Sequence, residues 1–144
     1  MFEKFRQLNR DTDTAKCKYL LLNLYYLSGY IIECIVKYGI YDLIGYSKDK
    51  EVTKLNNKEI TYKDHIRFHK FERYTEHLNK MISSPIPLIN NVEGIDKKVI
   101  QLYKKWDVEI RYSYDIKISE YQHYISFYNY SKKILKSVRL NVRG

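Results

Sequence analysis

The sequence predicts an all-α protein, an antiparallel bundle of four to five helices in a single domain over residues 1–144. Three observations support this prediction. Apolar residues recur every three or four positions through most of the chain, which is the period of a helix with one buried face. No segment of useful length alternates with the period of a strand. The length is typical of one domain, and the sequence contains no internal repeat.

The first long helix is expected over residues 14–44, after a short charged helix at 2–10. The run Asp-Thr-Asp-Thr at 11–14 is a dense N-cap signal for its start. Gly29 lies mid-helix at a cost of about 1 kcal/mol relative to Ala, so we expect another helix to approach it closely. Gly45 is expected to end the helix. The predicted core-facing stripe consists of Leu20, Leu24, Leu27, Ile31, Ile35 and Tyr38.

Three further helices are expected, over 61–82, 95–112 and 119–142. A polar loop at 46–60 precedes the first, and two prolines at 85 and 87 separate the first from the second. The predicted buried residues of the first are Ile66, Phe71, Tyr74, Leu78 and Met81. Those of the second are Val99, Leu102, Tyr103, Trp106 and Ile110. Those of the third are Tyr121, Tyr124, Ile125, Tyr128, Leu135 and Val138.

The net charge of +9 favours polyanionic partners such as RNA, or acidic proteins. Cys17 and Cys34 lie on apolar helical stretches, a placement typical of reduced thiols rather than of a disulfide scaffold. Residues 1–6 lack the apolar segment of a signal peptide. The apolar stretch 19–44 contains charges that are costly in a bilayer. We therefore expect a cytoplasmic protein without membrane association.

The C-terminal helix carries a predicted basic stripe. No acidic residue follows Glu120, and the basic residues step by four, three and four positions, opposite Leu135, Val138 and Val142. The stripe consists of Lys132, Lys136, Arg139 and Arg143. Such a stripe suits phosphate contacts and salt-dependent binding of nucleic acid. The alternative is a solvated face that complements the dipole at the helix C-terminus.

Two polar groups have plain structural interpretations. Glu33 and Lys37 are four positions apart, so they share a helix face and can form an ion pair. Two histidines and two glutamates of the 61–82 helix would share another face, and a His pair four apart can chelate a metal. They are His65, His69, Glu72 and Glu76. Because the His-Glu-x-x-His order of metalloproteases is absent, we interpret them as a solvated face and expect no metal and no cofactor.

Three sequence phrases in a fixed order stand out from the helical patterns. They are GYIIECIVK at 29–37, HKF at 69–71 and WDVEIRYS at 106–113. Together they resemble a HEPN domain, a small helical bundle found in prokaryotic toxin and defence systems. The resemblance implies an RNA-directed protein of a toxin–antitoxin or phage-defence system. It further implies a homodimer, a small nucleotidyltransferase-like partner protein that restrains it, and a cleft in which Glu33 lies near a catalytic Arg.

RNases of this family carry an Arg followed four to six residues later by a His. The Arg stabilises phosphoryl charge, and the His moves a proton during attack by a ribose 2′-hydroxyl. Here the first His after Arg111 is His123, twelve positions later, so the usual spacing is absent. If the chain cleaves RNA, the resemblance implies metal-independent transesterification in which Arg111 stabilises phosphate and His123 is the acid/base. Glu33 and Tyr112 would support them.

The alternative is a non-catalytic binding or scaffold module. In that interpretation Trp106 and Arg111 join two helices, and a basic C-terminal helix contacts RNA or a partner protein. The sequence leaves both hypotheses open.

Overall fold

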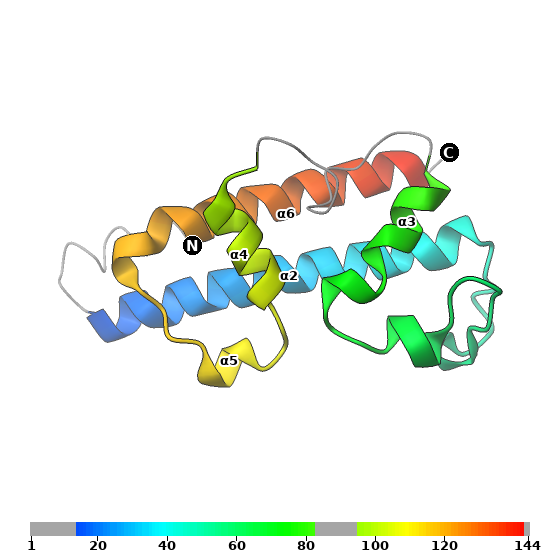
Figure 1. Ribbon diagram of the computed structural model, residues 1–144, viewed down its shortest axis with the longest axis horizontal. Coiled ribbons are helices and arrows are strands. Elements are labelled where there is room, and N and C mark those ends of the chain that lie inside the picture. Colours follow the sequence, from blue (N-terminus) through cyan, green and yellow to red (C-terminus); the bar gives the residue numbers. More distant parts are fainter. Residues whose placement is uncertain (1–13, 83–94, 143–144) are drawn as a thin grey trace.

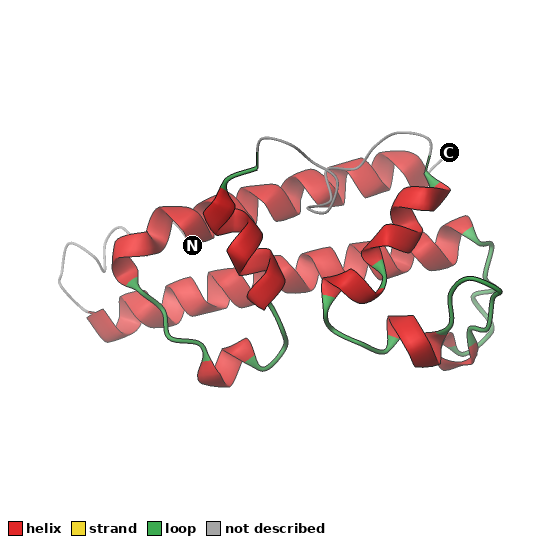
Figure 2. Ribbon diagram, viewed as in Figure 1, coloured by secondary structure: helices red, strands yellow, loops and turns green. Residues whose placement is uncertain are grey.

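Two long helices, α2 (Thr14–Leu43) and α6 (Tyr121–Val142), lie side by side (Figure 1). The computed structural model describes residues 14–82 and 95–142. Two shorter helices, α3 (Thr75–Met81) and α4 (Lys97–Lys105), run across this pair, and α5 (Ile110–Ser113) lies beside α2 on the side away from α6. The described residues contain no strand (Figure 2), which confirms the all-α prediction.

The two long helices are parallel rather than antiparallel. Both run from left to right in Figure 1, and Tyr25 near the start of α2 contacts Tyr124 and Phe127 near the start of α6. The antiparallel prediction assumed that long helices follow one another through short loops. Instead, the short elements between them return the chain to the N-terminal end of α2 before α6 begins.

Helix α2 has the predicted length, but its buried face is displaced by one position. Tyr25, Ile32 and Val36 are fully buried, whereas Leu27 and Tyr38 of the predicted stripe are exposed. Helical period alone does not choose between two adjacent apolar stripes. The stripe that the structure buries is the one that contains the small residues Ser28 and Gly29.

Gly45 ends α2 as predicted. Its φ is +68°, a left-handed conformation that glycine adopts without strain. The backbone N–H of Gly45 donates to the carbonyl of Asp42, and that of Tyr46 donates to the carbonyl of Tyr41. These two bonds form a Schellman motif, which satisfies carbonyl groups at the helix end.

The predicted helix over 61–82 is broken into three pieces. One wide turn (Tyr62–Ile66) has i→i+5 hydrogen bonds, a second turn covers Phe71–Arg73, and α3 follows. The histidines and glutamates of 65–76 therefore do not share one helical face. The buried side was predicted well: four of its residues are buried and Met81 is half-buried. The chain is extended at Lys70, beside a contact with α2 described below.

The predicted helix over 95–112 is also interrupted. Asp96 caps α4 by accepting a hydrogen bond from the N–H of Lys98, and α4 ends at Lys105. Trp106 has extended backbone and separates α4 from α5. All five residues predicted to be buried in this segment are buried. The break occurs because the Trp106 side chain is held against α2.

Helix α6 follows the prediction closely, with a single turn at Ile118–Glu120 before it. Tyr124 and Val138 are buried as predicted, together with three residues that were not in the predicted set. They are Phe127, Tyr130 and Ile134. The other predicted residues, including Leu135, are half-buried. The aromatic residues of this helix thus contribute to the core.

By length and composition alone, α2 could cross a membrane, with a mean hydropathy of 1.4. However, 44% of its apolar window is buried inside the protein. Its one buried carboxylate, Glu33, is paired with other side chains. The cytoplasmic location stays a prediction.

Candidate functional site

The three phrases that carry the HEPN resemblance meet at one place on α2, which we call the junction. Its residues are Gly29, Glu33, Lys37, His69, Lys70, Phe71, Trp106 and Asp107. The indole of Trp106 lies directly on Gly29, where an added methyl group would be 2.0 Å from Nε1. Trp106 is fully buried, stacks on Phe71 at 4.9 Å, and donates from Nε1 to the carbonyl of Tyr26 at 3.2 Å. The close approach expected at Gly29 is therefore made, by a single side chain.

Glu33 is the charged centre of the junction. Its Oε1 lies 2.7 Å from Nζ of Lys37 and 2.8 Å from Nδ1 of His69. Glu33 is only 4% exposed, so these partners replace water around the carboxylate. The predicted Glu33–Lys37 ion pair is confirmed. Lys37 also lies over the ring of Tyr74, 4.9 Å from its centre.

Lys70 and Asp107 tie the second and third phrases together. Nζ of Lys70 donates to the carbonyl of Trp106 at 3.4 Å and lies 3.8 Å from Oδ2 of Asp107. This contact holds the extended segment after His69 against the break between α4 and α5. The junction thus holds the segment at 69–71 and the break between α4 and α5 against α2.

The four residues proposed for catalysis lie on three elements, α2, α5 and α6. Arg111 lies on α5 with its guanidinium 5.6 Å from the ring centre of Tyr26, and Tyr112 is 85% exposed. Glu33 pairs with Lys37 and His69. In the described part of the chain, no hydrogen bond or ion pair joins Arg111 to His123 or to Glu33.

His123 lines a pocket of about 290 Å³ between α4, the loop at 114–117 and the start of α6. Three lysines and two carboxylates line the same pocket. They are Lys98, Lys105, Lys117, Asp115 and Glu120. Sequence reasoning missed this cluster because its members come from three elements with no common spacing.

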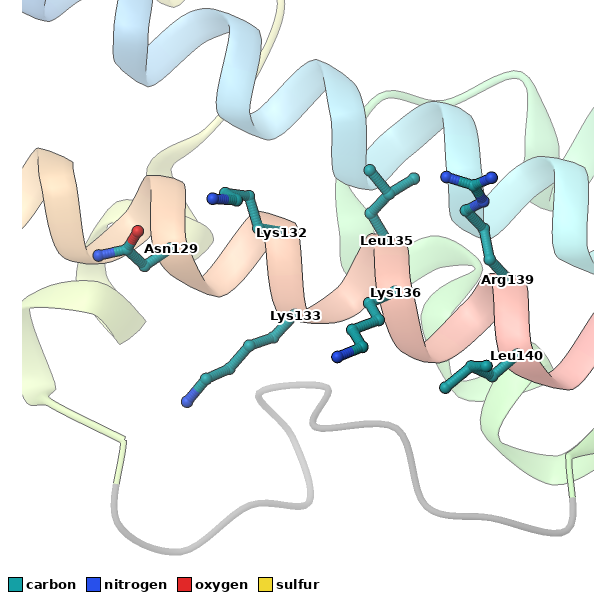
Figure 3. Close-up of a pocket in the computed structure, with 7 residues that line it drawn as sticks. All are labelled: Asn129, Lys132, Lys133, Leu135, Lys136, Arg139 and Leu140. Atoms are coloured by element: carbon teal, nitrogen blue, oxygen red, sulfur yellow. The ribbon is translucent and has the colours of Figure 1, made fainter. Parts of the chain in front are cut away.

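The outward face of α6 is basic. Lys132, Lys136 and Arg139 are exposed as predicted, and Lys133 belongs to the same face. Figure 3 looks onto the hollow that these residues line: Lys132, Leu135 and Arg139 extend toward its upper edge, and Lys133, Lys136 and Leu140 extend toward its lower edge. We call the four cations the α6 basic face. Arg143 lies outside the described residues.

Two details of the predicted stripe need correction. Leu135 was placed opposite the cations, but it is half-buried and borders the same hollow of about 820 Å³. The core direction is set by Tyr130, Ile134 and Val138, which are buried on the opposite side. Lys133 was missed because a strict three-or-four spacing from Lys132 excludes it, whereas the exposed face is wide enough to include adjacent positions.

Searches of known protein families, of curated proteins and of solved structures find no match to this chain. The HEPN resemblance stays a prediction from the three phrases.

Proposed function

We propose that this protein is an RNA-binding helical module that contacts the RNA backbone through the α6 basic face. The observation that carries the proposal is the exposure of four cations on one face, Lys132, Lys133, Lys136 and Arg139. No acidic residue occurs anywhere after Glu120, so no carboxylate of α6 neutralises them. Neutralisation of phosphates by such a face releases counterions and favours binding.

The cations are close enough to act together. Seven residues of helix separate Lys132 from Arg139, a rise of about 10 Å, which is comparable to the Debye length at physiological salt. Their fields therefore overlap. Nζ of Lys132 also lies 5.5 Å from the ring centre of Tyr128, so an aromatic surface adjoins the charged one. Aromatic rings beside a basic groove favour single-stranded RNA, whose bases can stack on them.

The test is a binding measurement on a fluorescein-labelled single-stranded oligoribonucleotide of mixed sequence. The variant replaces all four cations with glutamine: Lys132→Gln, Lys133→Gln, Lys136→Gln and Arg139→Gln. A matched control removes four exposed lysines elsewhere: Lys48→Gln, Lys50→Gln, Lys58→Gln and Lys63→Gln. We expect affinity to fall roughly tenfold or more in the α6 variant. The control has the same net charge and should lose much less.

Equal losses in the two variants would mean that RNA responds only to total charge, which would refute a site on α6. Because the replaced side chains are exposed, both variants should retain wild-type stability within about 0.5 kcal/mol. Urea unfolding checks this condition.

The endoribonuclease hypothesis stays a second candidate that rests on the resemblance. The resemblance places the site at the cleft of a homodimer. The measurement is cleavage of total cellular RNA in EDTA by wild type and by Arg111→Ala. Cleavage by wild type alone would support the catalytic hypothesis. No cleavage by either folded protein would favour the binding module.

The biological setting also follows from the resemblance. We propose a role in a toxin–antitoxin or phage-defence system, as a homodimer, with a nucleotidyltransferase-like partner protein. Co-purification of the full-length chain with such a partner, and sedimentation of the purified protein, test these two points separately.

A further inference from the structure

The pocket around His123 is separate from the α6 basic face. Its walls are α4, the loop at 114–117 and the first turns of α6, whereas the first cation of the α6 basic face is Lys132. Its volume of about 290 Å³ is close to the lower limit for small-molecule sites, roughly 300 Å³. The pocket therefore suits a compact ligand.

Tyr25 contacts two residues that line the pocket. The hydroxyl of Tyr25 donates to the carbonyl of Leu102, one of the last carbonyls of α4, at 2.5 Å. The Tyr25 ring also contacts the ring of Tyr114, 5.0 Å away. Since Leu102 and Tyr114 both line the pocket, Tyr25 holds two of its walls in place.

The charges of the pocket favour an anion with hydroxyl groups. Lys98 is partly compensated by Glu120, 3.7 Å away. Lys105 and Lys117 have no ion-pair partner among the described residues, so their charges are free to bind an anion. The carboxylate of Asp115 lines the same pocket and can accept hydrogen bonds from hydroxyl groups.

His123 supplies an independent observation. Its Nδ1 is buried and has no hydrogen-bond partner among the described residues. A buried polar atom of this kind is costly unless something binds it. Because Nδ1 is itself closed to solvent, a ligand would meet His123 through the other ring atoms that line the pocket.

From these observations we propose that the pocket binds a sugar phosphate, with the phosphate at Lys105, Lys117 and His123 and the sugar hydroxyls at Asp115 and Glu120. Two sources share this chemistry: a free sugar phosphate, and the phosphorylated terminal ribose of an RNA strand. The proposal uses none of the residues of the α6 basic face. It therefore stands or fails independently of the proposed function.

The test follows the four histidine Hε1 proton resonances during titration with ribose 5-phosphate at constant ionic strength. The resonance of His123 is assigned by comparison with His123→Gln. We expect this resonance to shift and saturate at millimolar ligand in wild type, and ribose alone to leave it unchanged. Lys105→Gln combined with Lys117→Gln should weaken binding about tenfold. The matched control, Lys58→Gln combined with Lys63→Gln, should bind like wild type.

Absence of a saturable His123 shift in wild type would overturn the proposal, whether or not the pocket variant folds. Equal weakening in the pocket variant and the control would overturn it as well. The source is then identified with 5′-phosphorylated and 5′-hydroxyl oligoribonucleotides added to the quadruple α6 variant. Tighter binding of the phosphorylated strand than of ribose 5-phosphate assigns the site to RNA ends. The reverse order assigns it to a free sugar phosphate.

Discussion

The junction on α2 and the basic face of α6 contain similar residue types but use them in opposite ways. At the junction, the carboxylate of Glu33 lies within 2.8 Å of both Lys37 and His69, and an indole covers Gly29. On α6, four cations extend into solvent with no acidic neighbour along the helix. The charge of Glu33 is paired within the protein at the junction, whereas the cations of the α6 basic face are exposed and can bind a partner.

This difference separates stability from binding. Removal of a buried contact at the junction creates a cavity or an unpaired group, which costs stability. Removal of an exposed cation costs little stability but reduces attraction for a polyanion. Substitutions at the junction should therefore change unfolding and leave the affinity of the folded protein for RNA unchanged. Substitutions on α6 should do the reverse.

Trp106→Ala should have the largest effect on stability. It removes a fully buried indole, its stacking on Phe71 and its hydrogen bond to Tyr26. We expect a loss of about 3–5 kcal/mol in the free energy of unfolding, measured with urea. The control, Tyr112→Ala, removes an aromatic side chain that is 85% exposed and should change stability by less than about 0.5 kcal/mol. A loss below about 1 kcal/mol for Trp106→Ala would contradict the role of the junction.

For Gly29→Ala we predict a loss of stability, whereas helix propensity alone would predict a gain. In an exposed helix this substitution would stabilise by about 1 kcal/mol. Here the new methyl group would lie 2.0 Å from Trp106, so the indole must move. We expect a destabilisation of about 1–3 kcal/mol from overpacking. A gain in thermal stability would show that Trp106 does not lie on Gly29.

Removal of the hydroxyl group from either of two buried tyrosines, Tyr25 and Tyr74, should have a smaller effect on the free energy of unfolding. The Tyr25 hydroxyl donates to Leu102, whereas the Tyr74 hydroxyl has no hydrogen-bond partner among the described residues. Tyr25→Phe should cost about 1 kcal/mol, and Tyr74→Phe should be neutral or slightly stabilising. Chemical denaturation at neutral pH compares them. Equal losses would indicate that the Tyr74 hydroxyl is satisfied.

The same tyrosines predict a loss of stability in alkali. Burial raises the pKa of Tyr25 and of Tyr74 well above the ordinary value of 10.0. Above pH 10 the unfolded chain releases these protons and the folded chain keeps them. Stability is therefore fully present below pH 10 and falls as pH rises, by up to about 1.4 kcal/mol per pH unit for each tyrosine. Tyr74→Phe should make this decline shallower, and an unchanged slope would contradict the assignment.

The sequence predicted helix positions well where one apolar face continues without competition. Helix α2 and helix α6 have nearly the expected bounds, and Gly45 ends α2 through the expected motif. The two middle helices were overextended, because the contacts that interrupt them are tertiary. Lys70 is extended beside Asp107, and Trp106 leaves helical geometry to reach Gly29. Local periodicity does not reveal contacts between residues that are more than thirty positions apart in the sequence, such as Lys70 and Trp106.

The candidate sites were predicted unevenly for the same reason. The α6 basic face lies on one helix, so residue spacing revealed three of its four described cations. The residues of the pocket around His123 come from α4, a loop and α6, so residue spacing could not reveal this pocket. The HEPN phrases identified residues that do meet in space, but their meeting point is the buried junction. Arg111 and His123 are not among the residues of the junction.

The salt dependence of RNA binding tests the separation of the two regions most directly. Affinity for single-stranded RNA is measured over a range of salt concentrations for wild type, the quadruple α6 variant and Gly29→Ala. If four cations contact phosphates, the plot of log affinity against log salt should have a slope of about −2.8 for wild type. The slope should remain so for Gly29→Ala and approach zero for the α6 variant. An unchanged slope in the α6 variant would contradict the account.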